Sequence, residues 1–168
     1  SLENVNPGET ITLTAGEEPT TATVMITFTP DDSNYAPITY GKKNVSVKAI
    51  SLKQEEISLA EEVYWNDTIE MVLPELKTEK DDQSVEGKYS VSLTNIVAVD
   101  ADGNEITDLT SMEPTTICLK ANKVTEDAKV KISFTPNSTK YSSVEYSEFI
   151  INVKLKNARQ RIFVVLLY

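Results

Sequence analysis

The chain contains one segment twice, and this internal repeat limits the possible folds more than any other feature. Residues 10–48 align without a gap with residues 116–154, at a constant offset of 106 residues from Thr10 to Thr116. Self-similarity at a fixed period indicates an array of equivalent units. A period of about one hundred residues has the size of a sandwich domain rather than of a solenoid turn. Identical pairs include Ile11/Ile117, Leu13/Leu119, Val24/Val130, Ile26/Ile132, Phe28/Phe134, Pro30/Pro136, Tyr35/Tyr141 and Tyr40/Tyr146.

Alternating apolar residues predict β-strands in both copies. In the first copy, residues 10–14 read TITLT and residues 23–29 read TVMITFT, which ends at Pro30. Alternation places every second residue on one face of a strand, and proline stops the ladder because it has no N–H to donate. The second copy repeats these runs, so we expect Phe28 and Phe134 to be buried at equivalent positions, each as the last inward residue of a core strand.

The material between the copies also predicts strands. Gly87–Thr94 alternates, and residues 100–103 (DADG) favour a hairpin turn with glycine at a positive φ. Residues 55–76 are ambiguous, because Ser58 and Glu61 fit a capping box whereas residues 68–73 alternate; we favour strands with at most a short helix. The fold class is therefore all-β: an Ig-like β-sandwich in tandem repeat, with one complete unit and one partial unit.

The repeat offset divides the chain into three parts. Residues 50–156 form a complete repeat, and residues 1–49 match only the C-terminal half of one. Residues 157–168 align with the start of the complete repeat, so we expect either the opening strand of a further repeat or a strand-donating tail. This tail is too short to span a membrane, and by strand addition it would cover the open sheet edge of residues 1–49, in the same molecule or the next.

Composition excludes several classes of function. The formal net charge is −10 and histidine is absent, which argues against nucleic-acid partners, anionic membranes and the commonest general base or metal ligand. The single cysteine, Cys118, allows no intrachain disulfide. It lies on the face opposite Ile117 and Leu119, so we expect a partly covered thiol rather than a nucleophile.

Two stretches carry a resemblance to a known family. Residues 22–48 (ATVMITFTPDDSNYAPITYGKKNVSVK) and 128–154 (AKVKISFTPNSTKYSSVEYSEFIINVK) resemble the Ig-like repeats of bacterial cell-surface proteins, in which a strand ending in F-T-P precedes a polar loop, N-Y and a valine strand. The first copy keeps Asn34-Tyr35, whereas the second has Lys140 before Tyr141. The resemblance implies a secreted or wall-anchored protein at the cell surface, with neighbouring repeats of the same protein as its partners and no catalytic residues.

The candidate site residues are few. Asp100, Asp102 and Glu105 are weak metal candidates, because position twelve of an EF-hand loop would be Ser111 rather than glutamate; a solvated hairpin turn is the favoured interpretation. Tyr64 and Trp65 are weak ligand candidates, since exposed aromatics stack on sugars. Neighbours on a strand face opposite sides, so we expect at least one of the two in the core.

A self-formed Lys–Asn isopeptide bond is a further hypothesis, with Lys131, Asn152 and Glu145 as the example residues. We predict no enzyme activity and no cofactor. The leading functional hypothesis is a structural spacer repeat that supports adhesion. The alternative is a module that binds a glycan or a host protein through its loops or the Tyr64-Trp65 region; an exposed aromatic pair or a concave patch favours this alternative.

Overall fold

The computed structural model describes residues 5–6 and 8–156, and all regular secondary structure in that part of the chain is β-strand. The chain divides into two compact units, Ser1–Ala49 and Ile50–Tyr168. This boundary is the one that the repeat offset predicts. The predicted strand or tail at residues 157–168 lies outside the described residues. An all-β fold was the prediction, and it is confirmed.

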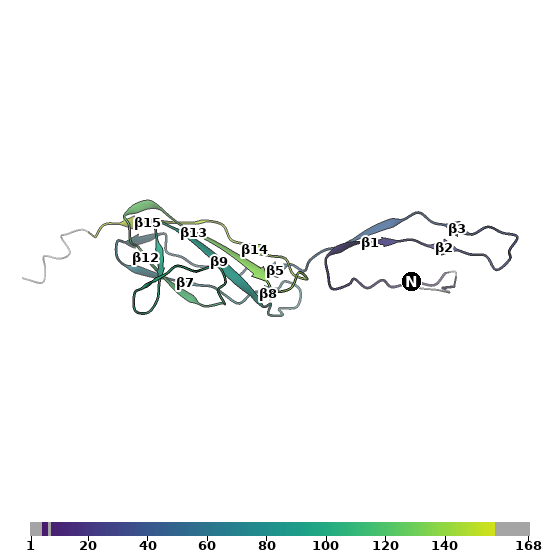
Figure 1. The fold of residues 1–168 in the computed structure, drawn as a ribbon, viewed down its shortest axis with the longest axis horizontal. Coiled ribbons are helices and arrows are strands. Elements are labelled where there is room, and N and C mark those ends of the chain that lie inside the picture. The colour runs from purple at the N-terminus through teal and green to yellow at the C-terminus, as the bar shows by residue number, and fades with distance from the viewer. Residues whose placement is uncertain (1–4, 7, 157–168) are drawn as a thin grey trace, which may run out of the picture. The chain divides into compact units, whose positions relative to one another are not determined.

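The second unit is a two-layer β-sandwich (Figure 1). One sheet has the antiparallel order β11-β10-β12-β7, and the other has the order β14-β13-β15-β6, with β9 paired to β13. A short pair, β5-β8, stands beside them. The strands of the first sheet are β7 (Thr68–Val72), β10 (Val97–Val99), β11 (Glu105–Ile106) and β12 (Thr116–Lys120). Those of the second sheet are β6 (Glu62–Tyr64), β9 (Gly87–Thr94), β13 (Thr125–Pro136), β14 (Val144–Glu145) and β15 (Phe149–Lys154), and the short pair is β5 (Leu52–Lys53) and β8 (Lys77–Thr78).

The core of this unit lies between the two sheets, where the predicted alternation is confirmed. Ile117 and Leu119 on β12 are buried, and so are Val130, Ile132 and Phe134 on β13. Burial of each such side chain contributes about 1.5–3 kcal/mol. The largest fully buried side chains are Tyr89, Phe134, Met71, Leu73, Leu76, Leu119, Ile151, Val130 and Val153.

The first unit consists of two short antiparallel ladders. Strand β1 (Thr20–Val24) pairs with β4 (Lys43–Val47), and β2 (Thr27–Phe28) pairs with β3 (Ile38–Thr39). Ala22 lies opposite Val45 just as Ala128 lies opposite Ile151, and Phe28 lies opposite Ile38 just as Phe134 lies opposite Val144. Residues 22–28 and their counterparts therefore pair in one register, because the same alternation and loop length specify the same hairpin. At the far end the registers differ: Thr20 lies opposite Val47, whereas Val153, the counterpart of Val47, lies opposite Thr125 across a bulge.

The predicted burial of Phe28 is wrong. Its side chain is 46% exposed, whereas Phe134 is 0% exposed. The predicted strand at residues 10–14 is also absent, although its counterpart β12 lies between β10 and β7. Both differences have one cause: the strands that face or flank the second copy, among them β7, β9 and β10, belong to residues 50–115 and have no counterpart among the described residues of the first unit.

The intervening region follows most of the predictions. The hairpin at residues 100–103 is confirmed, since Val99 lies opposite Glu105 and Gly103 has φ +85°. The capping box at Ser58 and Glu61 opens no helix, and residues 54–61 run without regular structure between β5 and β6. Burial explains this path, because Ile57 is buried in the core and Leu59 packs against it. No helix in the described part of the chain is long and apolar enough to cross a membrane.

Candidate functional site

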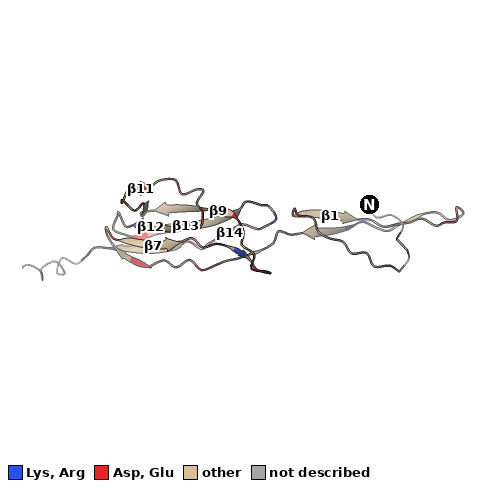
Figure 2. Cartoon of the chain, turned by 90° about the horizontal axis from the view of Figure 1, so that it is seen from below, with Lys and Arg blue, Asp and Glu red and all other residues tan. Residues whose placement is uncertain are grey.

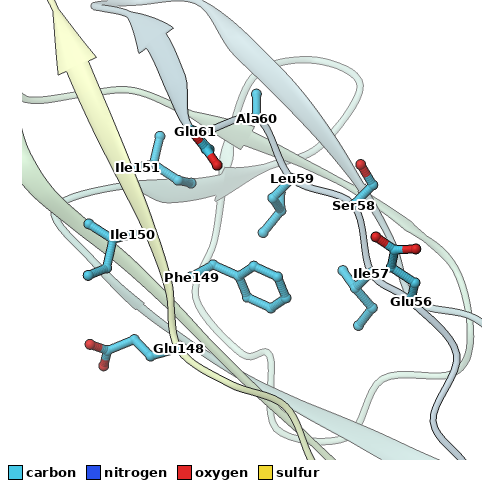
Figure 3. Close-up of a pocket in the computed structure, with 10 residues that line it drawn as sticks. All are labelled: Glu56, Ile57, Ser58, Leu59, Ala60, Glu61, Glu148, Phe149, Ile150 and Ile151. Atoms are coloured by element: carbon cyan, nitrogen blue, oxygen red, sulfur yellow. The ribbon is translucent and has the colours of Figure 1, made fainter.

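A hollow of about 340 Å³ lies between residues 56–61 and the first half of β15 (Figure 3). Phe149, Ile57 and Leu59 form its apolar floor, and Phe149 points into the gap between the two segments. Glu148 and Ile150 point to the other side of β15 in the same view. The hollow exists because residues 56–61 do not pair with this part of β15; the described ladder between β6 and β15 begins only at Glu62 and Asn152.

The chemistry of the hollow is limited. Its ten lining residues include three carboxylates, Glu56, Glu61 and Glu148, and one hydroxyl, Ser58, with no amine, thiol or imidazole. Lys131 and Lys129 both form ion pairs with Glu148, at 3.1 and 3.3 Å, and hydrogen bonds from these lysines hold the pKa of its carboxyl below the ordinary value. A concave apolar surface with an acidic rim can hold an apolar group, but its lining supplies no nucleophile with an adjacent base.

Before and after residues 56–61, which line this hollow, the first segment of the second unit pairs in parallel with its last segment. At one end, the Ile50 N–H donates to the Lys140 carbonyl (2.8 Å) and the Ser142 N–H donates to the Ile50 carbonyl (3.0 Å). The chain therefore enters this unit beside one end of the segment that closes it.

At the other end, the Asn152 N–H donates to the Glu61 carbonyl (2.8 Å) and the Trp65 N–H donates to the Lys154 carbonyl (2.7 Å). The Lys154 ammonium also pairs with the Glu62 carboxylate. Because the two segments run parallel, the chain enters the unit at one end and leaves it at the other.

The expectation that Tyr64 or Trp65 belongs to the core is wrong, because the two side chains are 49% and 50% exposed. Tyr64 is the last residue of β6, and Trp65 begins a turn in which the Asp67 N–H donates to the Tyr64 carbonyl (2.9 Å). Alternation across the sheet therefore ends between them. The Trp65 indole N–H reaches the Asn122 carbonyl at 3.4 Å. The structure brings two exposed aromatic residues together at one end of the unit.

Asp100, Asp102 and Glu105 lie around the β10–β11 hairpin. The Asp100 carboxylate accepts the backbone N–H groups of Asp102 (2.9 Å) and Asn104 (2.8 Å). The side-chain and backbone hydrogen bonds from Asn104 are the main reason why the pKa of Asp100 is lowered. One carboxylate oxygen thus closes the turn as an Asx motif. Among the described residues, no group of three acidic, cysteine or histidine side chains is arranged to hold a metal ion.

The remaining candidates are the Cys118 thiol, the three residues of the isopeptide hypothesis and a second hollow. The Cys118 thiol is partly buried on β12, as predicted. The isopeptide trio is not brought together: Glu145 lies opposite Ser133, Asn152 lies beside Glu62, and Lys131 is paired with Glu148. A second hollow, beside Gly87, has Glu75, Glu86 and Glu113 in its lining, and Glu113 is paired with Lys88.

Sequence reasoning did not find the hollow at β15 or the parallel ladder, because both depend on segments that are about ninety residues apart in the chain. Charged residues lie on turns as well as on strands (Figure 2), and acidic residues outnumber basic ones in the sequence.

A scan against known protein families found no matching family, and a search of curated proteins found no match.

Proposed function

We propose that the chain is a structural repeat of an extracellular bacterial surface protein, and that it spaces or presents other domains and supports adhesion. The observation that carries the proposal is the parallel pairing of the first and last segments of the second unit. The equal register of residues 22–28 and their counterparts adds support, because similar units at a fixed period are the pattern of an array. The extracellular bacterial setting rests on the F-T-P resemblance alone.

The parallel pairing suits a spacer that carries tension. A pull on residues 50 and 156 acts along the ladder formed by Val63 and Val153. The hydrogen bonds of a ladder loaded along its strands must break together, whereas those of a ladder opened from one end break one at a time. The second unit therefore resists force in the direction in which neighbouring domains would pull it.

Single-molecule force spectroscopy on the chain, flanked by reference domains, tests this role. Asn152→Pro removes the N–H that donates to Glu61 and should clearly lower the unfolding force. Ile150→Pro is the matched control: Ile150 lies two residues away on β15, so its N–H faces the same side, where the hollow replaces a pairing strand. Its unfolding force should stay close to that of the parent. Equal forces in the parent and the Asn152→Pro variant would rule out a load-bearing ladder.

A second candidate function is glycan binding at Tyr64 and Trp65, which their joint exposure favours. Because Trp65 is the sole tryptophan of the chain, its fluorescence reports this region directly. A panel of oligosaccharides should quench or shift the emission of the parent, and Tyr64→Ala should weaken that response. An unchanged emission spectrum across the panel removes this candidate.

A further inference from the structure

The parallel ladder of the second unit stops at residues 56–61, a segment that we call the strap. The Trp65 N–H donates to the Lys154 carbonyl at 2.7 Å, and the Asn152 N–H donates to the Glu61 carbonyl at 2.8 Å. The bonds of a parallel ladder recur evenly along both strands. Two further bonds are therefore expected beyond Glu61 if the strap continues the ladder.

The two expected bonds join Ile150 to the strap. By the register of β6 and β15, the Glu61 N–H would donate to the Ile150 carbonyl, and the Ile150 N–H would donate to the Leu59 carbonyl. Neither bond occurs within residues 8–156. The hollow of about 340 Å³ separates the strap from this part of β15 instead. In the described part of the chain, the Ile150 N–H and carbonyl therefore face the hollow.

Chain length alone does not stop the ladder at this point. Ile50 is bridged to Tyr141, and Glu62 is paired with Asn152. Glu62 lies 12 positions after Ile50, whereas Asn152 lies 11 positions after Tyr141. One surplus residue must therefore bulge somewhere between the two anchors. The part of the strap next to β6 follows the register of Glu62 directly, so the surplus residue does not prevent its pairing.

The position of the Glu61 side chain explains why the ladder stops. Val63 and Val153 are paired, and both are buried in the core. Glu61 lies two positions before Val63, so it belongs to the same face and lies opposite Ile151, which is 0% exposed. Nevertheless, Glu61 is exposed, and its carboxylate points into the gap between the strap and β15 (Figure 3). The hollow gives water access to a charge on the core face.

No neighbouring group compensates this charge. Among the described residues, Glu61 forms no ion pair, and no amine lines the hollow. Lys154 on β15 is paired with Glu62. If the strap closed on β15, the Glu61 carboxylate would be buried without a partner against Ile151. The cost of burying an unpaired charge exceeds the net contribution of two backbone hydrogen bonds.

We propose that Glu61 holds the strap open, and that loss of its charge lets the strap close on β15. In the closed state the two bonds of Ile150 extend the ladder, and Leu59 lies beside Phe149 in the same register. An inward-pointing charge is one of the features by which proteins limit pairing at a sheet edge. The strap is thus a two-state element whose position depends on one carboxylate. The inference holds whether or not the chain acts as a spacer.

Hydrogen exchange at the Ile150 amide, followed by NMR on the full chain, tests the inference. Glu61→Val should slow this exchange by about tenfold or more and raise the melting temperature, because the amide gains an acceptor. Glu61→Gln should change both in the same direction by less, since its amide group still loses water. Glu56→Val is the matched control: Glu56 is exposed beside the buried Ile57, so it gains the same strand propensity on the outward face. Its Ile150 amide should exchange as in the parent.

A second variant keeps the readouts independent. Ile150→Pro in the Glu61→Val background removes the N–H that the closed strap needs, so the gain in melting temperature should be lost. A gain that persists in the double variant would overturn the inference, and so would an Ile150 amide that exchanges equally in the parent and Glu61→Val. Equal slowing in Glu61→Val and Glu56→Val would also overturn it, because strand propensity rather than the inward charge would then be the cause.

Discussion

Phe134 packs against Tyr89 with ring centroids 5.0 Å apart and ring planes inclined by 60°. Both side chains are fully buried, and the Tyr89 hydroxyl donates to the Pro74 carbonyl at 2.8 Å. Phe28 occupies the position of Phe134 in the first copy, but within residues 5–6 and 8–49 no aromatic strand covers it. This contrast between two identical residues with the same register of pairing around them is the basis of the first prediction.

Phe134→Ala should destabilise the second unit by about 3–5 kcal/mol, the usual cost of emptying an aromatic core site. Phe28→Ala is the matched control and should cost less than about 1 kcal/mol, because the ring is already half exposed. Urea unfolding followed by Trp65 fluorescence measures the second unit, and hydrogen exchange at the amides of β1 and β4 measures the first unit, which holds no tryptophan. Similar losses in the two variants would show that Phe28 is buried in solution.

Tyr146→Phe should leave the stability unchanged or raise it slightly. The Tyr146 hydroxyl oxygen is buried and makes no hydrogen bond of normal geometry in the described part of the chain; it has only a weaker interaction with the Tyr89 hydroxyl, so its removal should cost little. Tyr89→Phe is the contrasting variant: it loses the bond to Pro74 and should cost about 0.5–1.5 kcal/mol. Thermal melts of both variants decide the point, and a destabilised Tyr146→Phe variant would mean that this hydroxyl is satisfied.

Gly103→Ala should destabilise the β10–β11 hairpin by about 1 kcal/mol, because Gly103 has φ +85° and a side chain is strained there. Asp102→Ala should have a much smaller effect, since the turn uses the Asp100 carboxylate and only the backbone N–H of Asp102. Calcium and a chelator should each leave the melting temperature unchanged. A clear shift with either would restore the metal interpretation of Asp100, Asp102 and Glu105.

Stability should fall in acid. Hydrogen bonds lower the pKa of the Asp100 carboxyl, and the bond from the side chain of Asn104 is the largest cause. Hydrogen bonds also lower the pKa of the Asp108 carboxyl, first among them the bond from the side chain of Thr110. A carboxyl whose pKa is lower in the folded state stabilises the fold above its unfolded pKa, about 3.9 for aspartate. That contribution is lost as the pH falls through the lowered folded pKa. Melting temperatures at pH 6 and pH 3 should therefore differ less in Asp100→Asn than in the parent.

An equal pH dependence in Asp100→Asn and the parent would mean that this carboxyl titrates alike in both states. Glu148 is a useful comparison, because its pKa is lowered mainly by Lys131 and then by Lys129, and this ion pairing weakens with salt. Its share of the pH dependence should shrink at high ionic strength, whereas that of the Asp100 turn should persist.

The sequence by itself determined most of the strands of both copies, with residues 10–14 as the exception. Alternation identified which residues of β13 face inward, and the turn residues at 100–103 identified the β10–β11 hairpin. The shared pattern also predicted equivalent positions in the two copies, and the ladders at Ala22 and Ala128 have the same register. These features are local: strand period, proline stops and loop length act within about thirty residues.

Only the tertiary structure decided which of these faces is buried. Phe28 and Phe134 share their local sequence, yet one is half exposed and the other is fully covered. Residues 10–14 and β12 likewise share a pattern, but only β12 has strands on both sides. The physical reason is that alternation defines an apolar face, whereas burial needs a second sheet and a flanking strand. Residues 50–115 supply these elements for the second copy alone.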